Sequence, residues 1–300
     1  MTVTDDGGSS GRLRRDFDVL PPGDIRNCMV ALSEDETLMA RLFQYRFASG
    51  RGLKGHNFGN LFLTAMTDLV GDFTQAVRFS SEVLAVRGHI YPSTAANVSL
   101  EATLAGGAKV KGETRISRSR LRIEQIALKP ASAKPLSETL AAIENADLIT
   151  LGPGSLFTSV IPNLLVDGMA EAIGRSPALK AYFVNLMSQP GETTNFSASD
   201  HVAAILRHAR GRAVIDTCIV NTRPILGRVA ARYRAKAAQP VEVDLENLEG
   251  MGLNVIATDL LRMAGTTSDG KIRHDPGVIG AIAVELAERG RGAKLQRKKR

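Results

Sequence analysis

The first residues of the chain combine carboxylates with small, flexible residues in a pattern suited to holding an anion. The loop at residues 5–11 consists of Asp5, Asp6, Gly7, Gly8, Ser9, Ser10 and Gly11. Such a loop lets the backbone adopt left-handed turns and direct its N–H groups at an anion. The two aspartates can instead bind Mg²⁺ carried by a nucleotide, with Asp5 as the protein ligand, accept a ribose hydroxyl, or cap the turn. We expect this loop to form part of a site for a phosphorylated ligand.

Two more loops of small and polar residues follow apolar segments further along the chain. Residues 152–155 come directly after the apolar run 148–151, and residues 185–194 follow the apolar residues 182–184. Ligands in open α/β sheets bind beyond the carboxyl ends of the strands, where backbone donors and helix N-termini can approach a phosphate. The candidate ligand residues in these loops are Gly152, Gly154, Ser155 and Asn185.

Three further polar residues are candidates outside these loops. Asp24 and Asn27, next to the turn at residues 21–23, are placed to hydrogen-bond a base or a sugar, and turn capping explains Asp24 equally well. Arg273 precedes the last predicted helix and can pair with a phosphate through two parallel hydrogen bonds. The sequence contains neither a Walker loop nor a nucleophile elbow.

Strands and helices are expected to alternate in the second half of the chain. Strand patterns lie near residues 148–151, 182–187, 214–220 and 255–258. Helix patterns lie near residues 166–173, 199–208 and 278–288. This alternation predicts an α/β fold with a Rossmann-like, mostly parallel sheet and flanking helices.

The first 130 residues show a different pattern. Residues 2–4 read as the end of a strand, and an apolar stripe over residues 58–70 predicts a helix that Gly71 ends. The pair at residues 72 and 75 resembles the cap of a second helix. Between residues 98 and 128, apolar and polar residues alternate, which predicts an antiparallel, β-rich insertion.

These patterns divide the chain into a core, an insertion and a tail. We predict a discontinuous α/β ligand-binding core of residues 1–82 and 131–288. The β-rich insertion covers residues 83–130, and a basic, disordered tail covers residues 289–300.

The charge and composition narrow the classes of function. Seven basic residues between Arg289 and Arg300 equal the formal net charge of +7, so the remaining body is formally neutral. Nucleic-acid binding is therefore expected only through the tail. No stretch approaches the roughly 18 apolar residues that cross a bilayer, and no basic-then-apolar leader is present. With two widely separated cysteines, Cys28 and Cys218, the sequence predicts a cytoplasmic protein without a membrane span.

Five ordered segments resemble motifs of the YvcK family of bacterial gluconeogenesis factors. They read DDGGSSGRLR at 5–14, PPGDIRN at 21–27, GHNFGN at 55–60, LGPGSLFTS at 151–159 and NLMSQPGET at 185–193. The resemblance extends over nearly the whole chain, as far as Arg273-His274-Asp275. Because five motifs occur in the same order, the resemblance is specific.

The resemblance implies a CofD-like fold, related to the transferase that joins phospholactate to a deazaflavin. It also implies a nucleotide-sugar or dinucleotide ligand, notably a UDP-linked sugar, and a role in growth on gluconeogenic carbon, cell shape and envelope synthesis. By motif, the implied ligand residues are Asp5, Asp6, Gly7, Gly8, Asn27, Gly154, Ser155 and Arg273.

The sequence departs from the family pattern in two places. Family members begin with a strand and a Gly-Gly-Gly-Thr-Gly loop ahead of the two aspartates. We therefore expect one strand–loop–helix unit of about 30 residues, with a further phosphate loop, upstream in the genomic sequence. Where the deazaflavin transferases carry a Pro-Asp-x-Asp-Thr segment, this chain has PGDIRN at residues 22–27, which argues against their specific activity.

The leading hypothesis is a regulatory protein that binds a UDP-sugar or dinucleotide and has no catalytic activity. It would link gluconeogenic carbon supply to cell shape and envelope synthesis, acting through a regulatory protein partner or as a homo-oligomer. The alternative is a Mg²⁺-dependent, CofD-like transferase that acts on a nucleotide diphosphate donor. An NAD-dependent oxidoreductase is disfavoured because no residue is identifiable as a partner in hydride transfer.

Overall fold

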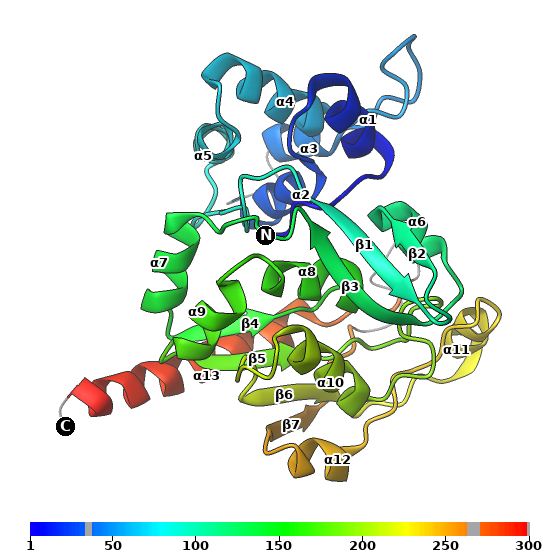
Figure 1. The fold of residues 1–300 in the computed structure, drawn as a ribbon, viewed down its shortest axis with the longest axis vertical. Helices are drawn as coiled ribbons and strands as arrows, with labels where there is room; N and C mark the ends of the chain where they lie inside the picture. The colour runs from blue at the N-terminus through cyan, green and yellow to red at the C-terminus, as the bar shows by residue number, and fades with distance from the viewer. Residues whose placement is uncertain (34–37, 263–270, 299–300) are drawn as a thin grey trace.

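The computed structural model describes residues 1–33, 38–262 and 271–298, which fall into a helical, an antiparallel and a parallel module (Figure 1). The helical module contains α1 (Gly8–Phe17), α2 (Gly23–Leu32), α3 (Leu38–Gln44), α4 (Phe58–Val70) and α5 (Phe73–Val83). Its core includes Ile25, Met29, Phe43 and Leu63, which are fully shielded from solvent.

The helix predicted at residues 58–70 is confirmed. Gly71 follows α4 in a left-handed conformation and ends it, as expected for a glycine C-cap. The side chain of Asp72 accepts a hydrogen bond from the Gln75 amide and so caps α5. The apolar stripe of α4 packs on α3 and α5, which explains why its period is visible in the sequence.

The antiparallel module is a sheet of β1 (Ser99–Leu104), β2 (Lys109–Lys111) and β3 (Ile123–Lys129), in the order β2-β1-β3. Ala102 lies opposite Val110 on one side and Ile126 on the other. The predicted antiparallel strands are confirmed. The helix α6 (Glu113–Arg118), between β2 and β3, was not predicted, because six residues are too few for a helical period to show.

The parallel module is built on β4 (Leu148–Leu151), β5 (Leu179–Phe183), β6 (Thr217–Asn221) and β7 (Asn254–Thr258), in the order β4-β5-β6-β7. All neighbouring strands run parallel. Its helical segments are α7 (Ser137–Asn145), η1 (Leu156–Val160), α8 (Ile161–Leu164), α9 (Met169–Arg175), α10 (Ala198–His208), α11 (Gly227–Arg234), α12 (Leu245–Gly250) and α13 (Pro276–Lys298). The predicted Rossmann-like, mostly parallel α/β sheet is confirmed.

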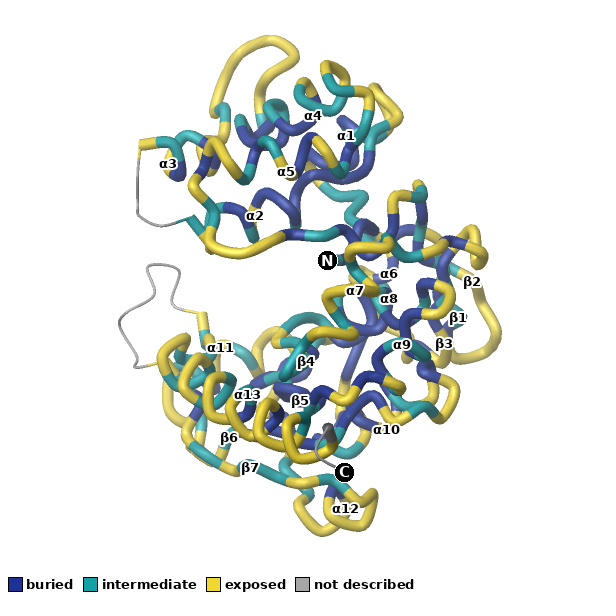
Figure 2. Tube along the Cα trace, turned by 90° about the vertical axis from the view of Figure 1, so that its left-hand side faces the viewer, coloured by how far each residue is buried: buried dark blue, intermediate teal, exposed yellow. Residues whose placement is uncertain are grey.

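Successive residues of the central strands enter two different cores. On β5, Tyr182 joins the core shared with α8 to α10 and the antiparallel sheet, whereas Phe183 joins the core under α13. On β6, Cys218 and Ile219 divide in the same way. The central strands are therefore buried on both faces, as is typical of parallel sheets, and exposed residues lie on the outer helices such as α12 and α13 (Figure 2).

The chain differs from the predictions at its beginning. The segment at residues 2–4 belongs to no strand. Instead, the amide of Ser93 donates to the Met1 carbonyl at 2.7 Å, so the extended segment lies beside residues 91–93. The predicted loop at residues 5–11 is shorter than expected, because α1 already begins at Gly8. Gly7, which has an extended backbone, is its N-cap.

The prediction of a disordered basic tail is wrong for residues 289–298, which continue α13. Arg291 Nε lies 3.0 Å from Asp147 Oδ2, and Lys294 Nζ lies 3.4 Å from Asp147 Oδ1. These ion pairs fasten the basic end of α13 to the start of β4. Residues 299–300 lie outside the described part of the chain.

Within the described ranges, no single helix is long and apolar enough to cross a membrane. One bent pair, Leu156–Leu164 with Met169–Arg175, meets the test of length and composition.

The attachment of α13 can be tested at a glycine. A Cβ on Gly290 would lie 2.0 Å from the Asp147 carbonyl oxygen, so Gly290→Ala must displace the helix or the strand. We expect a loss of about 1–3 kcal/mol in the free energy of unfolding, measured by urea denaturation. Gly292→Ala is the matched control, because no atom lies within 4 Å of its added Cβ. It should be neutral or stabilising by roughly 0.5–1 kcal/mol. Equal effects of the two changes would contradict this attachment.

Candidate functional site

A cavity of about 490 Å³ lies between the first turns of α2 and the edge strand β4. Its size falls within the roughly 300–1,000 Å³ of small-molecule sites. The cavity brings together four of the predicted residues, Asp24, Asn27, Gly152 and Gly154. Apolar residues of β4, α8 and α9 form much of the remaining wall, with Ser159 and Asn163 as polar groups among them.

The loop after β4 owes its shape to a glycine and to two amide side chains. Gly152 has a φ of 74°, and a Cβ there would lie 3.1 Å from the Phe183 carbonyl oxygen. Asn185 Nδ2 donates to the Gly154 carbonyl at 2.9 Å, and Gln189 Nε2 donates to Ser155 Oγ at 2.7 Å. Asn185 and Ser155 therefore hold the loop in place, and neither lines the cavity.

The two aspartates near the N-terminus point to different partners. Asp5 Oδ1 accepts a hydrogen bond from the Gly7 amide at 2.8 Å. Its Oδ2 lies against α2, since a Cβ on Gly23 would come within 2.6 Å of it. Asp6 Oδ1 accepts hydrogen bonds from the Thr114 amide at 2.8 Å and the Thr114 hydroxyl at 2.6 Å, so Asp6 caps α6.

The other predicted residues have local structural roles or lie elsewhere. Ser9 is buried, with its hydroxyl 3.1 Å from His56 Nδ1 and accepting a hydrogen bond from the Asn57 amide. Gly7 and Gly8 begin α1. Arg273 is exposed beyond β7, outside the lining of the cavity. Contact of Arg273 with a phosphate stays a prediction.

Two glutamates that were not predicted as site residues, Glu113 and Glu192, lie near the aspartates. Burial raises the pKa of Glu113 to about 8, with further contributions from Asp5, Asp24, Asp6 and Glu192, in that order. Burial likewise raises the pKa of Glu192. One carboxylate oxygen of each glutamate is buried without a hydrogen-bond partner among the described residues.

This carboxyl cluster lies where the helical, antiparallel and parallel modules meet. Ser117 of α6 donates to Glu192 Oε1 at 3.2 Å, and the backbone of Phe157 and the hydroxyl of Thr158 also bond to Glu192. Burial, followed by Asp5, raises the pKa of Asp24 to about 6. With a pKa of about 8, Glu113 is mostly protonated at pH 7, whereas Asp24, with a pKa of about 6, is mostly ionised.

The sequence offered no signal for these glutamates. Glu113 and Glu192 each follow a glycine and stand in different modules, 79 positions apart in number. Only the packing of α6 against the loop at residues 188–194 brings them together. Within residues 1–33, 38–262 and 271–298, no group of three or more His, Cys, Asp and Glu side chains is arranged to hold a metal ion. A metal at Asp5 would therefore need oxygen atoms from the ligand as well.

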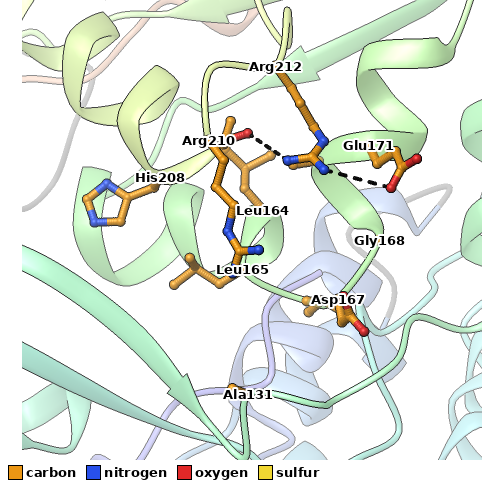
Figure 3. A pocket seen from close by; sticks show the side chains of 12 residues that line it. Ala131, Leu164, Leu165, Asp167, Gly168, Glu171, His208, Arg210 and Arg212 are labelled. Carbon is orange, nitrogen blue, oxygen red and sulfur yellow. Dashed lines mark hydrogen bonds and ion pairs between the residues drawn. The ribbon is translucent and has the colours of Figure 1, made fainter.

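A second pocket, beside the end of α10, is too small to hold a nucleotide (Figure 3). Its volume is about 90 Å³, and an ion pair of Arg212 with Glu171, 3.8 Å apart, crosses one side. His208 at its wall is already engaged at both ring nitrogens: Nδ1 lies 2.7 Å from the Ala204 carbonyl, and Nε2 accepts from the Ile126 amide. Burial lowers the pKa of His208, so this histidine joins α10 to β3 as a neutral group.

The chain is similar to known proteins both in sequence and in fold. The sequence profile described as "2-phospho-L-lactate transferase CofD" matches residues 1–261. The chain belongs to the CofD family. Within it, the sequence is 46% identical over 286 residues to the protein named "Gluconeogenesis factor" of Bacillus subtilis, covering 95% of this chain and 89% of that protein. The YvcK family resemblance is therefore confirmed.

Solved structures and longer relatives extend this comparison. A crystal structure of a UPF0052-family protein from Bacillus halodurans superimposes with a TM-score of 0.89 at 43% identity, covering 94% of this chain and 89% of that one. A relative from Nostoc is 45% identical over 285 residues, and these cover 95% of this chain but only 62% of that protein. The CofD-like fold is thus shown, and activities of the longer relatives are not thereby assigned to this chain.

The carboxyl cluster predicts an unusual dependence of stability on pH. The pKa of Glu113 is 4.5 ordinarily and about 8 in the folded protein, so between these values the folded state retains a proton that the unfolded state has lost. Stability from this group is therefore present below pH 4.5 and is lost as the pH rises to 8. We expect Glu113→Gln to match the wild type near pH 4.5 and to exceed it by on the order of 1–3 kcal/mol at pH 8.5.

Urea unfolding at both pH values measures this difference. Glu124→Gln, at an exposed position on β3, serves as the matched control and should leave the pH dependence as in the wild type. If the free energy of unfolding of Glu113→Gln depends on pH as that of the wild type does, Glu113 is ionised in the folded protein.

Proposed function

We propose that the cavity binds a nucleotide sugar of the UDP-linked class and that the protein acts as a cytoplasmic regulator of gluconeogenic carbon use. The observation that carries this proposal is that two predicted ligand segments meet on one cavity of ligand size. They are the start of α2, with Asp24 and Asn27, and the loop after β4, with Gly152 and Gly154. The names of the curated relatives support the link to gluconeogenesis. We include in this proposal that the protein links gluconeogenic carbon use to cell shape and envelope synthesis.

The walls of the cavity suit a ligand with a polar and an apolar part. Ile149, Leu164 and Ile173 provide an apolar surface on which a base or sugar ring can lie. Asn163 Nδ2 donates to the Ser159 carbonyl at 2.7 Å, whereas its Oδ1 is buried and has no described partner. An N–H or O–H donor of the ligand, such as the N3–H of uracil or a sugar hydroxyl, would satisfy this oxygen.

The cavity favours binding over covalent catalysis. Its only sulfhydryl among the described lining residues is that of Cys28, and burial raises the pKa of this thiol, so the nucleophilic thiolate is disfavoured. A regulator that binds and releases its ligand unchanged needs a second surface to pass on the signal. We propose that a protein partner or a second copy of the chain reads the ligand-bound state.

Thermal shift and calorimetry with UDP-sugars, NAD and GDP compounds test the binding. We expect UDP-sugars to raise the melting temperature most and to remain chemically unchanged after incubation. Asn163→Leu should weaken the binding of UDP-glucose about tenfold, because one hydrogen bond to a buried oxygen is lost. The melting temperature without ligand should fall slightly, because the bond from Asn163 Nδ2 to the Ser159 carbonyl is lost as well.

Asn145→Leu, at an exposed position at the end of α7, is the matched control and should bind as the wild type does. Consumption of the UDP-sugar would contradict the non-enzymatic part of the proposal. The absence of any UDP-sugar shift in the wild type would contradict the ligand class.

The matching family is described as a transferase, which supports a second candidate. We propose as this candidate a Mg²⁺-dependent transferase that acts on a nucleotide diphosphate donor. Asp5 would hold the metal together with phosphate oxygens of the donor. Asp5→Asn should then abolish Mg²⁺-dependent turnover, assayed by product chromatography, while circular dichroism and the melting temperature stay near those of the wild type. Turnover that survives in Asp5→Asn would exclude this role for Asp5.

A further inference from the structure

Arg26 is a buried arginine that forms no ion pair with a described carboxylate. It is 9% exposed, and its Nε has no hydrogen-bond partner among the described residues. Its Nη2 donates to Asn27 Oδ1 at 2.5 Å. None of the ion pairs formed by the described residues includes it. Because a buried charge without a counter-charge is costly, this residue calls for an anion that the described protein does not supply.

Arg26 lies on a different face of α2 from the residues that line the cavity. Asp24, Asn27 and Cys28, at the i, i+3 and i+4 spacing of one helix face, line the cavity. The side chain of Arg26 instead crosses the first turn of α4, since a Cβ on Gly59 would lie 2.9 Å from Arg26 Cγ and Cδ. The guanidinium therefore stands near the positive end of a helix of 13 residues.

A second arginine reinforces this positive charge. Arg46 is exposed and pairs through its backbone with Asn57, the N-cap residue of α4. The pKa of Arg26 is lowered by burial and then by Arg46, whereas Asp24 and Asp5 raise it to a smaller extent. Among charged neighbours, the largest influence on Arg26 is thus repulsive. An anion between the two guanidinium groups would remove this repulsion.

The first turn of α4 also offers a free backbone donor. The amide of Phe58 donates to the Tyr45 carbonyl at 2.8 Å, and the amide of Asn60 donates to Asn57 Oδ1 at 3.3 Å. The amide of Gly59, between them, has no acceptor in the described parts of the chain. A helix N-terminus with an open amide is a favourable place for an anion.

We propose that Arg26, Arg46 and the Gly59 amide form a binding site for an oxyanion of the phosphate class. The two guanidinium groups supply charge-assisted hydrogen bonds, which a tetrahedral oxyanion can accept on several oxygens. Exposure of Arg46 leaves the site open to solvent. The site uses another face of α2 than the cavity and does not rest on the proposed nucleotide-sugar function.

Titration with inorganic phosphate at constant ionic strength, balanced with chloride, tests the site. Phosphate should raise the melting temperature of the wild type, and sulfate should act in the same direction. Arg46→Gln should weaken phosphate binding about tenfold or more, because one charge-assisted contact is lost. Arg51→Gln, the same change at an exposed position on the same loop, should bind phosphate as the wild type does.

Arg26→Met provides a second variant with an opposite effect on the unliganded protein. It should abolish the response to phosphate, while the melting temperature without phosphate stays equal or rises, because an uncompensated buried charge is removed. A wild-type response no larger than that to chloride would overturn the proposal. A wild-type phosphate affinity in both Arg46→Gln and Arg26→Met would overturn it as well.

Adding UDP-glucose to the phosphate titration shows whether the site takes a free oxyanion or the diphosphate of a nucleotide. If UDP-glucose and phosphate bind the wild type together and Arg46→Gln affects only phosphate, the site takes a separate oxyanion. If phosphate competes with UDP-glucose and Arg46→Gln weakens both, the site takes the diphosphate of the nucleotide. Both results support the oxyanion site, and neither depends on whether turnover occurs.

Discussion

The contact of Asp6 with Thr114 joins segments that are 108 residues apart, and the arrangement of the site depends on it. The carboxylate accepts two hydrogen bonds at the first turn of α6, so it attaches the helical module to the antiparallel module. Because α6 carries Glu113 and also Ser117, which donates to Glu192, the same contact places both glutamates. One capped helix of six residues thereby determines where three modules bring their acidic groups together.

Charge is divided across α2 in a way that gives its two faces different chemistry. Towards the cavity the helix presents Asp24, whose pKa is raised to about 6 beside Asp5. Towards α4 it presents Arg26, beside Arg46 and the amide end of a helix. Buried carboxyl groups favour their protonated form, whereas a buried guanidinium keeps its charge and favours an anionic partner. One short helix therefore separates a face that carries a carboxyl group from a face that carries a guanidinium group.

The parallel sheet provides the rigid support on which the cavity is built. Its central strands β5 and β6 are buried on both faces, by α8 to α10 on one side and by α13 on the other. The loops at its carboxyl ends are held by Asn185 and Gln189, whose amides bond the loop after β4. Polar side chains in these loops thus fix the backbone on which the cavity is built.

The sequence by itself determined the α/β class, α4 with its end at Gly71, the cap of α5, the strand β4 and the antiparallel strands, because periodic burial and capping are local properties. It also predicted Asp24, Asn27, Gly152 and Gly154 as ligand residues, and the structure places these four on one cavity. Only the tertiary structure decided that Asp6, Ser9, Ser155 and Asn185 mainly hold the backbone, and that Glu113, Glu192 and Arg26 are buried. It also showed α13 continuing through the basic end, which local charge alone disfavoured. Burial and pairing depend on contacts between distant segments, and these contacts leave no local pattern.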